Sequence, residues 1–142
     1  MKYDDASWHY GGDFPEDLED EAGATHIGMF VAWCQLNGVG GEIHSEDFPE
    51  MLDKLKNREI TPAQWFMAAC DEKFTDEDLS EQGNEFTLWY YESEPAPYIS
   101  DYESYCSSDL KSLYHVPDTW ATYDTLSPVI LQQFNEWKKQ HG

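Results

Sequence analysis

Apolar residues recur at helical spacing along most of this chain, and the clearest pattern lies in residues 24–37. Its first stripe consists of Ile27, Phe30, Val31 and Cys34. These positions follow the i, i+3, i+4, i+7 spacing of one helix face. Most of the remaining positions are also apolar or small, which is typical of a buried helix. The small face around Gly28 and Ala32 predicts close approach by another element, and Gly38 is suited to end the helix.

Similar patterns predict further helices over residues 45–57, 62–70, 75–91, 98–106 and 127–139. Thr61 can cap the helix that Pro62 opens, because proline is tolerated at the first helical position. We expect Gly83 to be a weak point and Ser127 to begin the last helix. Residues 107–116 are ambiguous, and no convincing pair of strands is found. The pattern therefore predicts an all-α fold, a compact single-domain bundle of five to seven helices spanning residues 1–142.

Residues 1–23 differ from the rest, because acidic and turn-forming residues dominate them. Four aromatic residues are interleaved with the carboxylates: Tyr3, Trp8, Tyr10 and Phe14. A segment dissolved in solvent would not need so many rings. We therefore expect an irregular acidic N-terminal strap that packs its rings on the helical body and displays its carboxylates.

The charge balance restricts the classes of partner. Asp and Glu number 29 against 8 Lys and Arg, which gives a formal net charge of −21, while 40% of the residues are apolar. The apolar content excludes a disordered acidic tail. A negative field of this size repels nucleic acid and anionic membranes and attracts basic proteins. We therefore expect a basic protein partner, no nucleic acid and no membrane; the oligomeric state stays open.

The three cysteines indicate a reduced compartment. Cys34, Cys70 and Cys106 are far apart and form no Cys-x-x-Cys motif, which argues against a disulfide framework. The N-terminus has no apolar signal core, and the longest apolar run, residues 27–36, is too short to span a membrane. These features predict a cytoplasmic protein.

Catalytic signatures are weak. Glu42 and His44 are two possible ligands two residues apart. Together with His26 and with Asp13 or Glu16 they could form a zinc or iron site, but the spacing matches no His-Glu-x-x-His or Cys-x-x-Cys…His pattern. Scattered structural histidines are the simpler interpretation. Cys106 is the one plausible exposed thiol, and no hydrolase motif surrounds it. The sequence thus assigns no catalytic residue, no metal ligand and no cofactor.

Three stretches carry a family resemblance: residues 3–15 (YDDASWHYGGDFP), 22–30 (AGATHIGMF) and 113–120 (LYHVPDTW). They resemble a family of small, acidic, uncharacterised bacterial single-domain proteins. In size and acidity such proteins are similar to the cytosolic immunity proteins that accompany secreted toxins. The resemblance implies a stand-alone domain and assigns no functional residue.

Two functions follow as hypotheses. The first is an acidic binding protein that neutralises a basic partner, most simply an immunity protein that blocks a bacterial toxin such as a nuclease. The residues expected to bind that partner are Trp8, Tyr10, Glu16, Asp17, Glu19, Asp20 and Glu21. The alternative is a small enzyme or metal- or ligand-binding domain. Its site would use Trp8, His9, Asp13 and His26, with His44 as a further candidate. A third interpretation is an interaction module whose charge serves solubility alone.

Overall fold

A computed structural model describes residues 1–12 and 14–141 of the chain. Within them the α-helices are α1 (Ala6–Tyr10), α2 (Thr25–Leu36), α3 (Glu42–Glu46), α4 (Pro49–Lys56), α5 (Pro62–Ala69), α6 (Glu81–Tyr90), α7 (Pro97–Cys106) and α8 (Trp120–His141). The strands are β1 (Lys2–Asp5) and β2 (Lys73–Thr75), and the 3-10 helices are η1 (Asp20–Ala24), η2 (Asp76–Asp78) and η3 (Leu113–His115). The fold is mostly α, as predicted, although the described residues hold more helices than expected.

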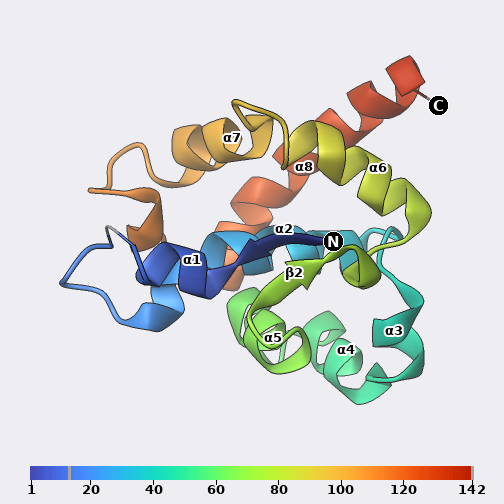
Figure 1. Cartoon of the computed structure of the whole chain (residues 1–142), viewed down its shortest axis with the longest axis horizontal. Helices are drawn as coiled ribbons and strands as arrows, with labels where there is room; N and C mark the ends of the chain where they lie inside the picture. The colour runs from blue at the N-terminus through green and yellow to red at the C-terminus, as the bar shows by residue number, and fades with distance from the viewer. Residues whose placement is uncertain (13, 142) are drawn as a thin grey trace.

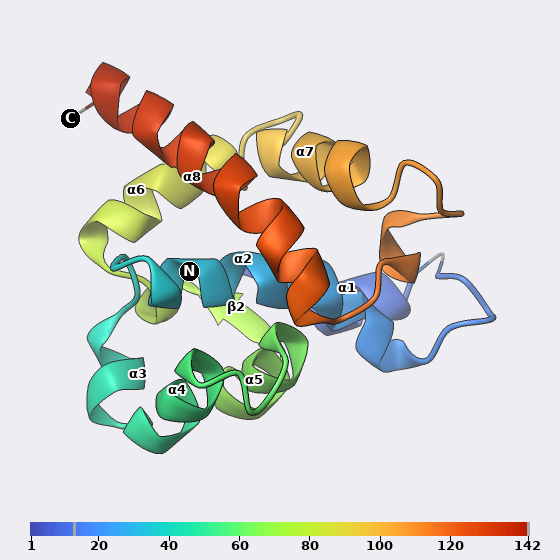
Figure 2. The ribbon, with the colours of Figure 1, turned by 180° about the vertical axis from the view of Figure 1, so that it is seen from behind.

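Helix α2 forms the centre of the molecule. It runs between α3, α4 and α5 on one side and α6, α7 and α8 on the other (Figures 1 and 2). Every residue from Thr25 to Cys34 is buried, which confirms the prediction of a buried helix. The small face is confirmed as well, because a Cβ on Gly28 would lie 2.9 Å from the Cα of Ala63 in α5. No ordinary side chain fits at that contact.

Aromatic rings make up much of the core. The centroid of the Phe30 ring lies 5.1 Å from that of Tyr91, 5.2 Å from that of Tyr98 and 5.9 Å from that of Phe74. Trp33 and Trp65 are fully buried. Large rings bury much apolar area per residue. This core stabilises a body whose surface carboxylates repel one another.

Strands β1 and β2 pair in antiparallel fashion, with an irregular register between Lys2 and Asp4. This small sheet contradicts the expectation of no strand pair. Residues 3–5 are all buried, so β1 lacks the alternation of buried and exposed positions that identifies strands in a sequence. The N-terminal segment is thus regular over residues 2–10, and residues 14–19 remain without helix or strand.

Two predicted helices start or divide elsewhere than expected. The predicted helix over residues 45–57 is two helices, because Pro49 opens α4 and α3 has already ended at Glu46. Helix α6 begins at Glu81, where the Ser80 hydroxyl accepts a hydrogen bond from the backbone of Gly83. Gly83 is not a weak point. Its missing side chain lets α6 approach the backbone carbonyl of Val39.

The last helix starts earlier than Ser127. Helix α8 begins at Trp120, where the Thr119 hydroxyl accepts from the backbone N–H of Thr122 at 3.2 Å. Pro128 lies inside the helix, so it was wrong to take the Ser-Pro pair as a start. Helix α8 is the longest, but neither it nor any other helix in residues 1–12 and 14–141 is both long and apolar enough to cross a membrane.

Candidate functional site

Two histidines meet a buried carboxylate near the N-terminus. The Asp4 carboxylate contacts the ring of His9, and His9 Nε2 lies 2.8 Å from Asp4 Oδ1. His26, in the first turn of α2, brings its Nε2 to 3.8 Å from Asp4 Oδ2. The two imidazole rings pack edge to face at 4.5 Å between centroids. We call Asp4, His9 and His26 the Asp-His-His cluster.

Two tyrosines hold this cluster in place from distant parts of the chain. The Tyr91 hydroxyl, at the end of α6, donates to Asp4 Oδ2 at 2.6 Å. The Tyr114 hydroxyl, in η3, lies 2.7 Å from His9 Nδ1. Both ring nitrogens of His9 therefore have partners. Those of His26 have none among the described residues, although the side chain is 1% exposed.

Burial and charge set the protonation states of the cluster. Burial lowers the pKa of His26 to about 3, helped by the charge of His9 and opposed by that of Asp4. Burial alone would raise the pKa of Asp4, but hydrogen bonds from His9 and Tyr91 and the charges of both histidines lower it. At neutral pH the cluster therefore presents a neutral imidazole at His26 and an ionised carboxylate at Asp4.

The cluster lies at the edge of a solvent-open pocket. Besides the three cluster residues, the wall includes Tyr91 and the segment that joins α6 to α7. Three further carboxylates line it: Glu92, Glu94 and Glu103. Burial and the charges of Asp4 and Glu94 raise the pKa of Glu92. The pocket is thus suited to a cationic ligand.

The sequence model of one family, described as "Domain of unknown function (DUF7832)", matches residues 2–116. The chain belongs to this family. No curated protein and no solved structure matches the chain. All five residues of the cluster and its tyrosines lie within the part of this DUF7832 protein that the family model covers, and α8 lies beyond it.

The alternative site predicted from the sequence is realised in part. His9 and His26 come together, as that hypothesis requires. Trp8 does not join them, because its side chain is 56% exposed and its ring faces the Lys2 ammonium. Asp13 lies outside the described residues. The carboxylate that the histidines do meet, Asp4, was missed. One signal in the sequence could have indicated it. Two aspartates are adjacent before α1, and because Asp5 caps the helix, the side chain of Asp4 is left for another role.

The predicted partner-binding residues occupy the surface. The five carboxylates are all exposed: Glu16, Asp17, Glu19, Asp20 and Glu21. Asp17 Oδ2 lies 3.0 Å from His115 Nε2, and the ring of Phe14 packs on that of Tyr114 at 4.9 Å. The segment is therefore pinned to the body, as predicted. Trp8 and Tyr10 are two positions apart on α1 and do not share a face.

His44 belongs to a second cluster and does not join His26. Its Nε2 lies 2.8 Å from Asp78 Oδ1 and 3.7 Å from Cys70 Sγ, and its ring packs against that of Trp65. Burial raises the pKa of the Cys70 thiol well above its usual range. Because the thiol and the carboxylate approach the same nitrogen, the arrangement does not form a nucleophilic triad.

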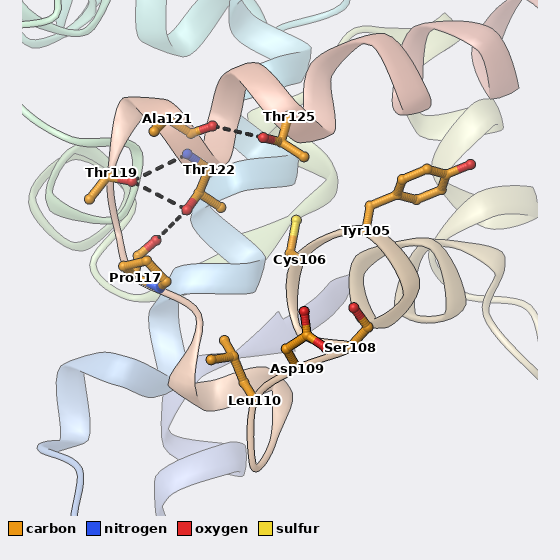
Figure 3. Close-up of a pocket in the computed structure, with 10 residues that line it drawn as sticks. All are labelled: Tyr105, Cys106, Ser108, Asp109, Leu110, Pro117, Thr119, Ala121, Thr122 and Thr125. Carbon is orange, nitrogen blue, oxygen red and sulfur yellow. Dashed lines mark hydrogen bonds between the residues drawn. The ribbon is translucent and has the colours of Figure 1, made fainter.

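Cys106 lines a separate pocket between α7 and the start of α8 (Figure 3). Its thiol points toward α8, and the other lining residues include Thr122 and Thr125 (Figure 3). Burial raises the pKa of Cys106 to about 11. The thiol is therefore half-buried and protonated at neutral pH, which does not favour a nucleophilic role.

Proposed function

We propose that this DUF7832 protein binds a basic protein and neutralises it, as an immunity protein neutralises a bacterial toxin. The binding surface is the acidic end of the molecule, made by residues 14–24 together with α1. One observation carries the proposal. Five exposed carboxylates, Glu16, Asp17, Glu19, Asp20 and Glu21, lie within six consecutive residues, and contacts of Phe14 and Asp17 hold this segment on the body.

Carboxylates from other segments join this patch, and the raised pKa of Tyr10 reflects their charges. Glu72 raises it most, burial contributes next, and Asp20, Asp5 and Glu21 raise it further. These carboxylates come from β1, from η1 and from the turn before β2. A patch assembled from several elements presents a defined array of negative charge, which attracts and orients a cationic partner.

Trp8 supports the proposal because a cation, the Lys2 ammonium, already lies over its ring. The Lys2 ammonium lies 4.9 Å from the centroid of the Trp8 ring and 2.8 Å from Asp5 Oδ2. An aromatic face beside a carboxylate is a favourable site for a cation. A lysine or arginine of the partner would bind there in place of Lys2, and the exposed ring would supply apolar contact.

A nuclease toxin fits this surface especially well. Its groove is positive because it binds phosphates, and carboxylates spaced along residues 14–21 would imitate the phosphate backbone. Charge would then set the rate of association, and Trp8 would limit the rate of dissociation.

The test starts from the partner itself. Tagged protein captures basic proteins from its host at low salt, and the identified partner is then purified for kinetic measurements. The surface variant carries Glu19→Gln, Asp20→Asn and Glu21→Gln. A matched control carries Glu50→Gln, Asp53→Asn and Glu59→Gln, which removes the same charge from the exposed surface of α4 and the turn after it.

We expect the surface variant to lower the association rate about tenfold at low salt, and the control to change it less than about twofold. The effect should shrink as salt screens the charges. Equal effects of the two variants would mean that the association rate depends only on the total negative charge and not on its position, which would contradict the proposal. So would an association rate that salt leaves unchanged.

A further inference from the structure

We propose that Asp4, His9 and His26 bind one divalent transition-metal ion, with zinc as the best fit. His9 lies in α1, which the proposed partner surface includes, but the three ligands are not among the residues expected to bind the partner, so the metal site stands or fails independently. Each of the three residues offers one ligand atom, and these atoms all lie within 4.8 Å of one another. Two imidazoles and one carboxylate form a donor set that zinc prefers.

The spacing suits the ion. Metal–ligand bonds of about 2.0–2.2 Å in tetrahedral geometry place ligand atoms roughly 3.3–3.5 Å apart. Asp4 Oδ1 lies 2.8 Å from His9 Nε2, and Asp4 Oδ2 lies 3.8 Å from His26 Nε2. Because one ligand atom from each residue lies within 4.8 Å of the others, closing any pair to this spacing takes at most about 1.5 Å.

His26 supplies an independent observation. Its imidazole is 1% exposed, and neither ring nitrogen has a hydrogen-bond partner within residues 1–12 and 14–141. A buried polar atom without a partner destabilises the fold, so such atoms are rare in folded proteins and call for an explanation. A metal ion bound to Nε2 satisfies the nitrogen that points toward Asp4.

The hydrogen bonds of His9 and Asp4 are those expected around a metal site, whereas Nδ1 of His26 has no partner among the described residues. Ligating histidines are usually fixed by a contact through the second ring nitrogen, and ligating carboxylates by donors to the second oxygen. His9 Nδ1 contacts the Tyr114 hydroxyl at 2.7 Å, and Asp4 Oδ2 accepts from Tyr91 at 2.6 Å. Both contacts leave His9 Nε2 and Asp4 Oδ1 directed at each other, where the ion would bind.

The pocket provides access and an open coordination position. It is lined by all three ligands and by Glu92, Glu94 and Glu103, whose charges favour entry of a cation. Three protein ligands leave a fourth position of a tetrahedral ion for water or a ligand from the pocket. The ligands of the site are therefore positioned as in sites that bind small molecules through the metal, rather than as in closed structural sites.

The experiment is a titration of the full-length, metal-stripped protein with Zn²⁺ and Co²⁺ in excess Mg²⁺, which occupies the unspecific surface carboxylates. We expect one equivalent to bind with micromolar affinity or better and to raise the melting temperature. His9→Gln and Asp4→Asn should each weaken binding at least tenfold. Far-ultraviolet circular dichroism of both variants establishes that they fold.

A matched control separates this site from His44, Cys70 and Asp78, whose ligand atoms also converge. Cys70→Ser should leave stoichiometry and affinity unchanged, and bound Co²⁺ should show no near-ultraviolet charge-transfer band from a thiolate. Loss of binding in Cys70→Ser, or such a band, would place the ion at the other cluster and overturn the proposal. Failure to bind one equivalent, or equal binding by folded His9→Gln, would overturn it as well.

Discussion

Tyr91 donates a hydrogen bond of 2.6 Å to Asp4, although 87 residues separate the two in the sequence. The bond joins the end of α6 to β1 and is buried. Burial and the charge of Asp4 raise the pKa of Tyr91 well above its usual range, so its hydroxyl stays protonated and donates. The contact thus fixes the first strand to the aromatic core.

Removing that hydroxyl should destabilise the fold. Tyr91→Phe keeps the ring packed on Phe30 and leaves a buried carboxylate oxygen without its donor, which costs about 1–3 kcal/mol. Urea unfolding in the presence of a chelator measures the loss. Tyr105→Phe, at a side chain that is 58% exposed, is the control and should change the unfolding free energy little. Equal stability of Tyr91→Phe and wild type would contradict the assigned role.

The helical body could largely be predicted because its signals are local. The stripes of α2 and α5 repeat within one element, and Thr61 forms with Gln64 the capping box that opens α5. Where the prediction was wrong, a tertiary contact had decided the outcome. Gly83 lies inside α6 because the helix needs a small residue against Val39, and no local pattern reveals that.

The Asp-His-His cluster could not be assembled from the sequence for the same reason. His9 meets Tyr114 across 105 residues, and Asp4 meets Tyr91 across 87. No spacing along the chain encodes such contacts. His9 and His26 were nevertheless predicted to share one site. The carboxylate predicted with them, Asp13, lies outside the described residues, and Asp4, which is buried in β1, was missed.

Asp5 should stabilise the fold in a pH-dependent way. It caps α1 by accepting from the backbone and hydroxyl of Ser7, and it pairs with Lys2 at 2.8 Å. Burial alone would raise its pKa, but these contacts lower it to about 2. Because the folded pKa is below the unfolded value of about 3.9, the unfolded state binds more protons between them. Stability therefore falls as pH drops through that window.

Two substitutions separate the charge of Asp5 from its cap. Asp5→Asn keeps a capping side chain and removes the charge, so its stability deficit should be present above about pH 4 and vanish near pH 2. Asp5→Ala also loses the cap and should cost about 1 kcal/mol more at every pH. Chemical unfolding between pH 2 and 6 measures both. A deficit of Asp5→Asn that grows toward low pH would refute the assignment.

Cys106 should react slowly with alkylating reagents in the native protein. Burial raises its pKa to about 11, so its thiolate fraction at pH 8 is roughly a hundredfold below that of a free cysteine. We expect the native rate with iodoacetamide to rise about tenfold per pH unit between 8 and 10. Mass spectrometry of the labelled peptide measures it, and Cys106→Ser and urea-unfolded protein are the controls. A rate already at its plateau at pH 8 would argue against a buried thiol.

Gly28→Ala should destabilise the protein even though alanine is the better helix former. The gain in helix propensity is about 1 kcal/mol. Against it, the new Cβ would lie 2.9 Å from the Cα of Ala63 and 3.1 Å from the carbonyl oxygen of Pro62. These are backbone atoms, so α2 and α5 must move apart, and overpacking of this kind costs about 1–3 kcal/mol before the propensity gain is subtracted.

Gly12→Ala is the matched control, because its Cβ would meet only ordinary contacts at 3.6 Å and beyond. Thermal and urea unfolding should rank wild type and Gly12→Ala above Gly28→Ala, and the reverse order would mean that the two helices are not held in close contact at this position.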